Sequence, residues 1–72
     1  MARRSLKNVR QEEAIRTFVR LGGVERPGKG SHRVVNLNSM NLSIPYGILK
    51  EGLLRYLIKI SGVSVEDFLK AL

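Results

Sequence analysis

The residues of this chain that could do chemistry lie together in one short run, Lys29-Gly30-Ser31-His32-Arg33. His32 is the only histidine in the chain, and imidazole is the side chain that takes and returns a proton near neutral pH. The nearby cations attract a phosphodiester and stabilise the negative charge that develops while it reacts. This combination is typical of RNA cleavage, in which a base activates the 2′-hydroxyl group. The candidate catalytic residue is therefore His32, and the candidate RNA-binding or phosphate-binding residues are Arg26, Lys29, Gly30, Ser31 and Arg33.

Other chemistries at the same run fit less well. Ser31 lies beside His32 in sequence, but a catalytic serine and its base must meet in space, and a third group that orients them is missing. The run Gly28-Lys29-Gly30-Ser31 could grip a phosphate, yet it lacks the spacing of a P-loop. One histidine, no cysteine and scattered carboxylates do not form a set of metal ligands, so we expect neither a metal nor another cofactor. A lone histidine is most often structural, so the surrounding cations carry the assignment of His32.

The charge of the chain favours an anionic partner. Thirteen Lys and Arg residues oppose six Asp and Glu residues, which gives a formal net charge of +7 at pH 7 and an isoelectric point near 10.6. Such an excess favours a polyanion, because each neutralised phosphate releases counterions. An acidic protein would also be attracted, so charge alone leaves both kinds of partner open.

Composition and length predict one small globular domain. An apolar content of 43% and a charged content of 26% are ordinary for a folded protein, and 72 residues suit a single domain with a small core. The absence of cysteine excludes disulfides. No apolar run approaches the roughly 18 residues of a membrane span, and Met1-Ala2-Arg3-Arg4 does not resemble the start of a signal peptide. We therefore expect no membrane association and, by default, a cytoplasmic location.

The elements that must position the candidate residues begin with a helix. From about Asn8 the apolar residues recur at helical spacing, and Ala14, Ile15, Phe18 and Val19 form one stripe. Gly22 supplies the left-handed residue that ends such a helix. Residues 1–7 carry three cations and little apolar content, so we expect a flexible basic arm there.

Three short strands follow the first helix. Val24-Glu25-Arg26 is the first, and Pro27-Gly28 after it predicts a turn with a positive φ at the glycine. The second strand runs from Ser31 to Leu37. A polar turn, Asn38-Ser39-Met40-Asn41, then leads to a third strand, Leu42-Ser43-Ile44.

The two faces of the second strand differ in composition. Arg33, Val35 and Leu37 share one face, because side chains alternate along a strand. We expect this more apolar face to pack on the helices. His32 then faces outward.

Two helices complete the chain. The first lies within Lys50 to Ser61 and is closed by Gly62, and Ser64 caps a last short helix. This order predicts the α+β class, with an antiparallel meander covered on one face by two helices and its other face open to nucleic acid. The double-stranded-RNA-binding domain has this α-β-β-β-α arrangement, here with an extra short C-terminal helix. We expect residues 1–72 to form this one domain.

Several short motifs occur in a fixed order from about Glu13 to Leu72. They are Leu21-Gly22-Gly23, Lys29-Gly30-Ser31-His32, Ile44-Pro45, Gly52-Leu53-Leu54-Arg55, Gly62-Val63-Ser64 and Glu66-Asp67-Phe68-Leu69. As an ordered set in so short a chain, they resemble the HicA-type (YcfA-like) mRNA interferase toxins of bacterial toxin–antitoxin pairs. The resemblance implies a double-stranded-RNA-binding-like fold and cleavage of RNA without a metal or the ribosome. It also implies that His32 is catalytic, that Gly30 keeps the active edge open, and that a HicB-type antitoxin covers the histidine region.

Two features depart from the pattern of that family. Arg33 stands where many members have a second histidine, and residues 36–41 stand where many carry a basic turn that contains His-Pro. The first departure leaves His32 to serve as both base and acid, unless water, Lys29 or Arg33 assists. The second leaves the substrate platform less cationic.

Two further functions remain open beside RNA cleavage. A non-catalytic RNA-binding module of the same fold would bind RNA in a strongly salt-dependent way and leave it intact. A protein-interaction domain would use its basic face only to meet an acidic partner and would have no RNA affinity. RNA cleavage by His32 is the leading hypothesis.

Overall fold

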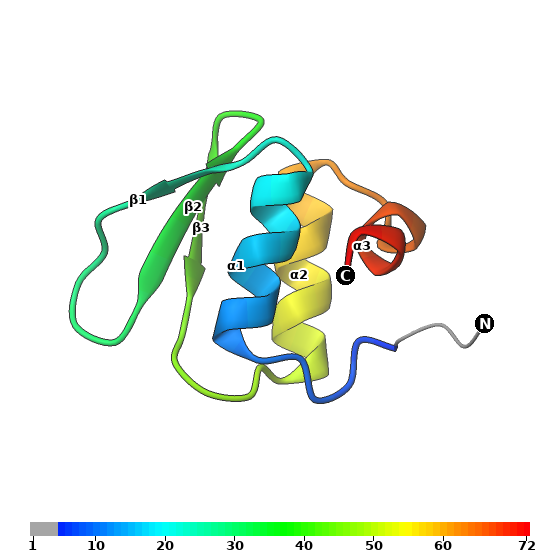
Figure 1. Cartoon of the computed structure of the whole chain (residues 1–72), viewed down its shortest axis with the longest axis horizontal. Helices are drawn as coiled ribbons and strands as arrows, with labels where there is room; N and C mark the ends of the chain where they lie inside the picture. Colours follow the sequence, from blue (N-terminus) through cyan, green and yellow to red (C-terminus); the bar gives the residue numbers. More distant parts are fainter. Residues whose placement is uncertain (1–4) are drawn as a thin grey trace.

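A computed structural model describes residues 5–72 of the chain. Its elements, in order, are α1 (Gln11–Arg20), β1 (Val24–Arg26), β2 (Arg33–Leu37), β3 (Met40–Ile44), α2 (Glu51–Ser61) and α3 (Val65–Ala71). The predicted α+β class and the order of helix, three antiparallel strands and two helices are confirmed. The sheet lies at one end of the molecule, and α1 and α2 lie between the sheet and α3 (Figure 1).

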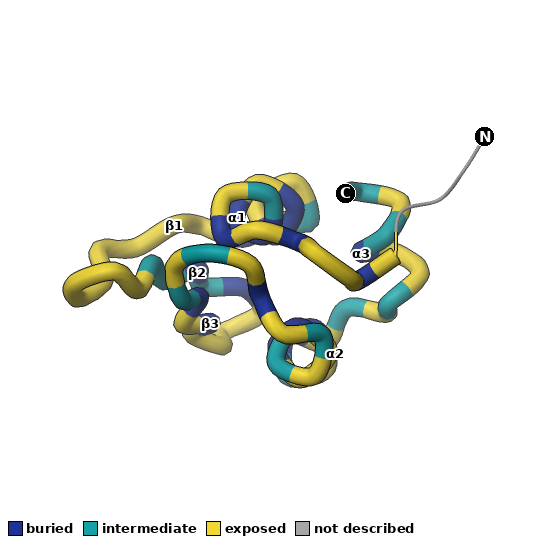
Figure 2. The backbone as a smooth tube through the Cα atoms, turned by 90° about the horizontal axis from the view of Figure 1, so that it is seen from below, coloured by how far each residue is buried: buried dark blue, intermediate teal, exposed yellow. Residues whose placement is uncertain are grey.

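The sheet has the strand order β1-β2-β3, and one of its faces packs on the helices. Val35, Leu37, Leu42 and Ile44 on this face are each at most 3% exposed. The expected assignment of the faces of β2 is thus confirmed for its apolar residues. The tube in Figure 2 shows the buried positions gathered where the sheet meets α1 and α2, with exposed backbone along the β1–β2 loop.

The core joins all three helices to the sheet. Its buried side chains are Leu6, Val9, Ala14, Ile15, Phe18, Val35, Leu37, Leu42, Ile44, Leu49, Leu54, Leu57, Ile58 and Phe68. Phe68 fixes α3, because its ring lies 5.1 Å from the ring of Phe18 between centroids, at 56° between planes. The last helix is therefore part of the core and not an appendage.

The chain before α1 differs from the prediction. The helix begins at Gln11 and not near Asn8, because Asn8 has a φ of 59° and Arg10 is extended. The Val9 carbonyl accepts a hydrogen bond from Leu49 N–H at 2.8 Å, which ties this segment to the chain before α2. Of the predicted flexible arm, residues 1–4 lie outside the described residues. Leu6 is buried in the core, so the packed chain begins earlier than predicted.

The end of α1 needs two glycines for different reasons. Gly22 has a φ of 110°, which confirms it as the left-handed residue after the helix. Gly23 is needed for space, because a Cβ on it would lie 2.6 Å from Val35 Cγ1 and 2.9 Å from the Phe18 carbonyl oxygen. This close approach seats the end of α1 directly on β2.

The β2–β3 connection is shorter than the predicted four-residue turn. Leu37 pairs with Met40, so only Asn38 and Ser39 lie between the strands. Their φ angles are 52° and 67°, the positive pair that defines a type I′ hairpin turn. Asn38 Nδ2 donates a hydrogen bond to the Ser61 carbonyl at 2.7 Å, which fastens the turn to the end of α2.

Both C-terminal helices end or begin as predicted. Gly62 follows α2 with a φ of 82°. Ser64 caps α3, and its hydroxyl accepts a hydrogen bond from Asp67 N–H at 3.0 Å.

Candidate active site

The loop that carries His32 turns at Gly30 and not at Gly28. His32 N–H donates to the Lys29 carbonyl at 3.0 Å, and Gly30 has a φ of 60° at the second position of this turn. A positive φ at that position alone is typical of type II′ turns, which favour glycine there. The positive φ predicted for Gly28 was wrong. The loop requires Gly28 for space instead, because a Cβ on it would lie 2.2 Å from the His32 carbonyl oxygen.

A buried glutamine holds this loop against the rest of the fold. Gln11, the first residue of α1, is 7% exposed. Its Nε2 donates to the Ser31 carbonyl at 2.8 Å and to the Ile44 carbonyl at 2.9 Å, and its backbone N–H donates to the Gly47 carbonyl at 2.9 Å. One side chain therefore joins the residue before His32 to the end of β3.

His32 itself is exposed at the rim of this fixed loop. Within residues 5–72, no hydrogen bond or ion pair involves its imidazole. Such an imidazole is free to accept a proton from a bound group. In this part of the chain, no second protein group forms a hydrogen bond with the imidazole to orient it or to exchange protons with it.

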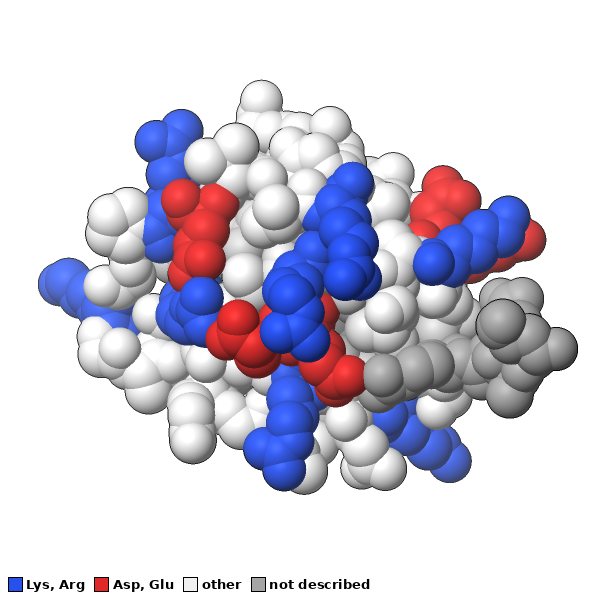
Figure 3. Space-filling view, in the orientation of Figure 1, with Lys and Arg blue, Asp and Glu red and all other residues white. Residues whose placement is uncertain are grey.

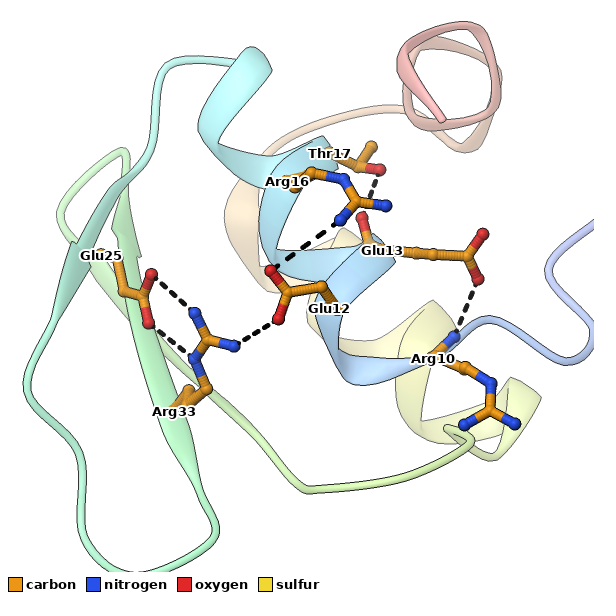
Figure 4. Close-up of polar contacts among 7 residues, drawn as sticks. All are labelled: Arg10, Glu12, Glu13, Arg16, Thr17, Glu25 and Arg33. Atoms are coloured by element: carbon orange, nitrogen blue, oxygen red, sulfur yellow. Dashed lines mark hydrogen bonds and ion pairs between the residues drawn. The ribbon is translucent and has the colours of Figure 1, made fainter.

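Arg33 is engaged by two carboxylates and does not point to an open phosphate site. Its Nε and Nη2 donate to the two carboxylate oxygens of Glu25 at 2.8 and 3.0 Å, and its Nη1 donates to Glu12 Oε1 at 2.6 Å (Figure 4). Glu12 also lies 3.8 Å from Arg16. The hydrogen bonds that Arg33 donates to Glu25 and Glu12 raise the pKa of Arg33, and those to Glu25 lower the pKa of Glu25.

Arg26 and Lys29 differ from Arg33 because neither makes an ion pair within the described part of the chain. Lys29 and Gly30 lie in the turn together with Ser31 and His32, and all four are exposed. Arg26 ends β1 and pairs in register with Val34, on the face away from the helices. The structure thus gathers Lys29, Gly30, Ser31 and His32 in one turn and directs Arg33 toward α1.

Carboxylates are absent from a long stretch around the turn. No Asp or Glu occurs from Arg26 to Lys50, and the six carboxylates lie at residues 12, 13, 25, 51, 66 and 67. On the face of the molecule seen in Figure 3, red carboxylates lie among the blue cations of the helix side and interrupt the positive surface. In the loop and on the open sheet face, Lys29 and Arg26 are cations that no ion pair in the described part of the chain neutralises.

A shallow depression of about 540 Å³ lies on the open face of the sheet beside the loop. Arg26, Pro27, Val34, Asn36 and Asn41 line it. Asn36 Nδ2 donates to Asn41 Oδ1 at 2.9 Å across the two strands. Polar groups with unused hydrogen-bonding capacity thus continue from the turn onto the sheet.

Sequence reasoning missed the residues that fix the site. Gln11 carries no recognisable signal, because a polar residue at a helix start is usually a solvated cap. Glu12 and Glu25 could have been identified as candidate partners of Arg33. The predicted face of β2 turns Arg33 toward the helices, and these two carboxylates lie on the first helix and on the neighbouring strand.

No group of three or more His, Cys, Asp or Glu side chains that could hold a metal ion occurs between residues 5 and 72. None of the helices in that range has the length and apolar character needed to cross a membrane.

Comparison with known proteins gave no relative. No protein-family model, no curated protein and no solved structure matches the chain significantly.

Proposed function

We propose that this chain is a metal-independent RNA endonuclease, an mRNA interferase toxin of the HicA type with a double-stranded-RNA-binding-like fold that acts in the cytoplasm. The observation that carries the proposal is the setting of His32. An unpaired, exposed imidazole lies on a loop that Gln11 fixes to the fold, in a stretch of chain that has cations and no carboxylate. This setting favours a phosphodiester as the group brought to the imidazole.

The proposed reaction needs one proton acceptor and a source of positive charge. The His32 imidazole accepts the proton of the RNA 2′-hydroxyl, and the 2′-oxygen forms a bond to phosphorus. The bond from phosphorus to the 5′-oxygen breaks, and that oxygen takes up a proton. The products are a 2′,3′-cyclic phosphate and a 5′-hydroxyl, so no external redox partner or cofactor is required.

The ion pairs of Arg33 exclude this residue as the second proton carrier. A guanidinium whose pKa is raised by two carboxylates does not release a proton, so Arg33 is no general acid. The proton for the 5′-oxygen then comes from the imidazolium of His32, from Lys29 or from water. We assign Lys29 and Arg26 to the phosphates, with Ser31 and Gly30 at the edge of the loop, and Arg33 to positioning the start of β2.

The partner that the resemblance implies is a HicB-type antitoxin. The same exposed turn that admits RNA is open to a protein that covers His32. An acidic antitoxin surface would meet the unpaired Lys29 and Arg26, and bound antitoxin would compete with RNA.

The test is incubation of the purified chain with labelled single-stranded RNA in EDTA, next to the His32→Ala variant. We expect cleavage by the native chain alone, with a rate at least about 100-fold lower in the variant, because proton transfer contributes about 10²–10⁴-fold. The variant should still bind RNA or antitoxin. Equal cleavage by both proteins would reject His32 as the catalytic residue.

A non-catalytic RNA-binding module is the second candidate function. The observation in its favour is that no described group orients the imidazole of His32. This candidate predicts that RNA is retained in a gel shift, released by added salt and never cut.

A further inference from the structure

The open face of the sheet is a polar surface organised by the strand register. Two cross-strand rows cover it, because paired residues of antiparallel strands share a face. One row is Val24, Asn36 and Asn41, and the other is Arg26, Val34 and Ser43. The depression of about 540 Å³ lies over both rows.

The amide pair at the centre of this face keeps most of its hydrogen-bonding capacity. The bond from Asn36 Nδ2 to Asn41 Oδ1 uses one donor and one lone pair. Asn41 retains both N–H donors, and Asn36 retains its carbonyl oxygen and one N–H. Donors and acceptors held side by side match the edge of a nucleobase, as asparagine does when it contacts adenine.

The charge of the face selects an anionic ligand. Its only charged residue is Arg26, which has no carboxylate partner among residues 5–72, and the face contains no Asp or Glu. The carboxylate nearest in sequence, Glu25, lies on the other face and is bound to Arg33. The face also lacks the aromatic anchors that are enriched at the centre of protein interfaces.

We propose that this open face binds single-stranded RNA next to the phosphodiester at His32, and that Asn36 and Asn41 read the edge of one base. Side chains read RNA sequence mostly on single-stranded bases that are splayed out, because the major groove of an RNA duplex is too deep and narrow for them and its shallow minor groove is recognised mostly by shape. The inference rests on the proposed function for the identity of the ligand. It adds the strandedness of the substrate and the residues that set its sequence preference.

The spacing along β2 agrees with a flanking base. Asn36 lies four residues after His32, a span of at most about 13 Å at about 3.3 Å per residue. Residues 33–36 belong to the extended strand β2, so the amides of Asn36 and its partner Asn41 lie farther along the strand than the imidazole and not beside it. They are close enough to contact a neighbouring nucleotide of the same strand.

The test uses Asn41→Asp, which is isosteric and keeps the acceptor for Asn36 while replacing two donors by a negative charge. It is made in the His32→Ala background, so that the RNA stays intact, and affinity is read from the fluorescence anisotropy of a short labelled RNA in EDTA. We expect about tenfold weaker binding of single-stranded RNA, as for the loss of one hydrogen bond to a charged or polar ligand group. Ser43→Glu on the same face should act in the same direction.

Asn8→Asp is the matched control, because it makes the same chemical change at an exposed position before α1. It should alter the affinity by less than about twofold. Equal weakening by Asn8→Asp and Asn41→Asp would overturn the inference in favour of net charge alone. Unchanged RNA affinity in both open-face variants would also overturn it and leave the face to a protein partner.

These outcomes are separate from those of the cleavage assay, because the His32→Ala background contains no catalysis. Loss of RNA affinity in Asn41→Asp together with an inactive native chain would keep this inference and reject the nuclease. If the native chain cleaved RNA but the substitutions at Asn41 and Ser43 did not change RNA affinity, the nuclease would be kept and this inference rejected.

Discussion

The β1–β2 loop and the β2–β3 turn join the same central strand to its two neighbours, but residues 27–32 form the first and only Asn38 and Ser39 form the second. The short turn sets its backbone geometry with two positive φ angles, and its own Asn38 side chain donates a hydrogen bond to the Ser61 carbonyl of α2, 23 positions later in the chain. The long loop is instead held from outside, because its Ser31 carbonyl accepts a hydrogen bond from the buried Gln11 side chain, twenty positions earlier in the chain.

The two connections serve different purposes: the β2–β3 turn only closes the sheet, whereas the β1–β2 loop also presents the side chain of His32. Two residues are enough to reverse a strand, as residues 38–39 do. The four additional residues of the β1–β2 loop bury nothing, because residues 27–32 are all exposed. A loop that is exposed yet held by a buried amide is typical of functional loops on a rigid scaffold.

The largest effect on stability and on cleavage is expected from replacing Gln11, because its side chain is what holds the β1–β2 loop. Gln11→Ala leaves the carbonyls of Ser31 and Ile44 without their donor. The free energy of unfolding should fall by about 2–3 kcal/mol, the lower part of the range for two unsatisfied groups at about 1–3 kcal/mol each, because Ser31 is exposed to water. Cleavage by the protein that remains folded should fall as well, because His32 loses its fixed position. Thermal denaturation and RNA cleavage at a temperature below the transition measure the two effects.

Asn38→Ala is the control on the other connection. It removes the hydrogen bond from the Asn38 side chain to the Ser61 carbonyl at the partly buried end of α2, so the free energy of unfolding should fall by about 1 kcal/mol. Cleavage per folded molecule should stay at the native level. If the two variants reduced cleavage equally, the contrast between the loop and the turn would be lost.

A smaller effect is expected from exchanging the residue types of the two turns. Ser39 has a φ of 67°, which costs a residue with a Cβ about 1 kcal/mol relative to glycine. Ser39→Gly should raise the free energy of unfolding by about 0.5 kcal/mol after the greater freedom of glycine in the unfolded chain is subtracted. The melting temperature should therefore rise by about 2–4 °C, with unchanged cleavage.

Gly30→Ala is the reciprocal substitution in the β1–β2 loop. A Cβ on Gly30 would contact nothing within 4 Å, so only its φ of 60° opposes the change. The free energy of unfolding should fall by about 1 kcal/mol. A stabilising Gly30→Ala, or a destabilising Ser39→Gly, would contradict the assigned turn geometry.

The sequence predicted the regular elements well because their signals are local. The apolar stripe of α1, the alternation in β2 and β3, and the ends marked by Gly22, Gly62 and Ser64 depend on residues close to one another in the chain. These features are present as predicted. Three boundaries moved: the first helix begins at Gln11 and not near Asn8, the second strand begins at Arg33 and not at Ser31, and the third strand begins at Met40 and not at Leu42. They depend on individual φ angles, at Asn8, Gly30, Asn38 and Ser39, that a residue pattern does not specify.

The site was predicted less completely because its supports are distant in sequence. The Lys29-to-His32 turn could be identified from residue type, but that Arg33 binds Glu25 of β1 and Glu12 of α1 at the same time is set by how both elements pack around the start of β2. The same holds for the bonds from Gln11 to Ser31 and Ile44. The turn lies at Gly30 and not at Gly28 as predicted. The role of Gly28 could not be predicted from the sequence, because it rests on the close approach of its backbone to the His32 carbonyl in the folded chain.

The smallest effect on stability is expected at the ion pair between Arg33 and Glu25, which lies at the start of β2. The hydrogen bond from Arg33 lowers the pKa of Glu25 in the folded chain, so the unfolded chain binds a proton at a higher pH than the folded chain does. The contribution of Glu25 to stability is therefore present at neutral pH and is lost as the pH falls through the lowered pKa. The native chain should melt slightly above Glu25→Gln at neutral pH, and this difference should shrink and vanish as the pH falls below the ordinary pKa of a glutamate and through the lowered pKa of Glu25.

The pair is exposed to solvent, so added salt should also reduce the difference at neutral pH. Glu51→Gln is the control, because Glu51 pairs with Arg55 inside one helix and does not join two elements. A Glu25→Gln difference that grew as the pH fell would contradict a lowered pKa at Glu25. The Arg33 pairing would then not be what anchors the start of β2 beside the His32 loop.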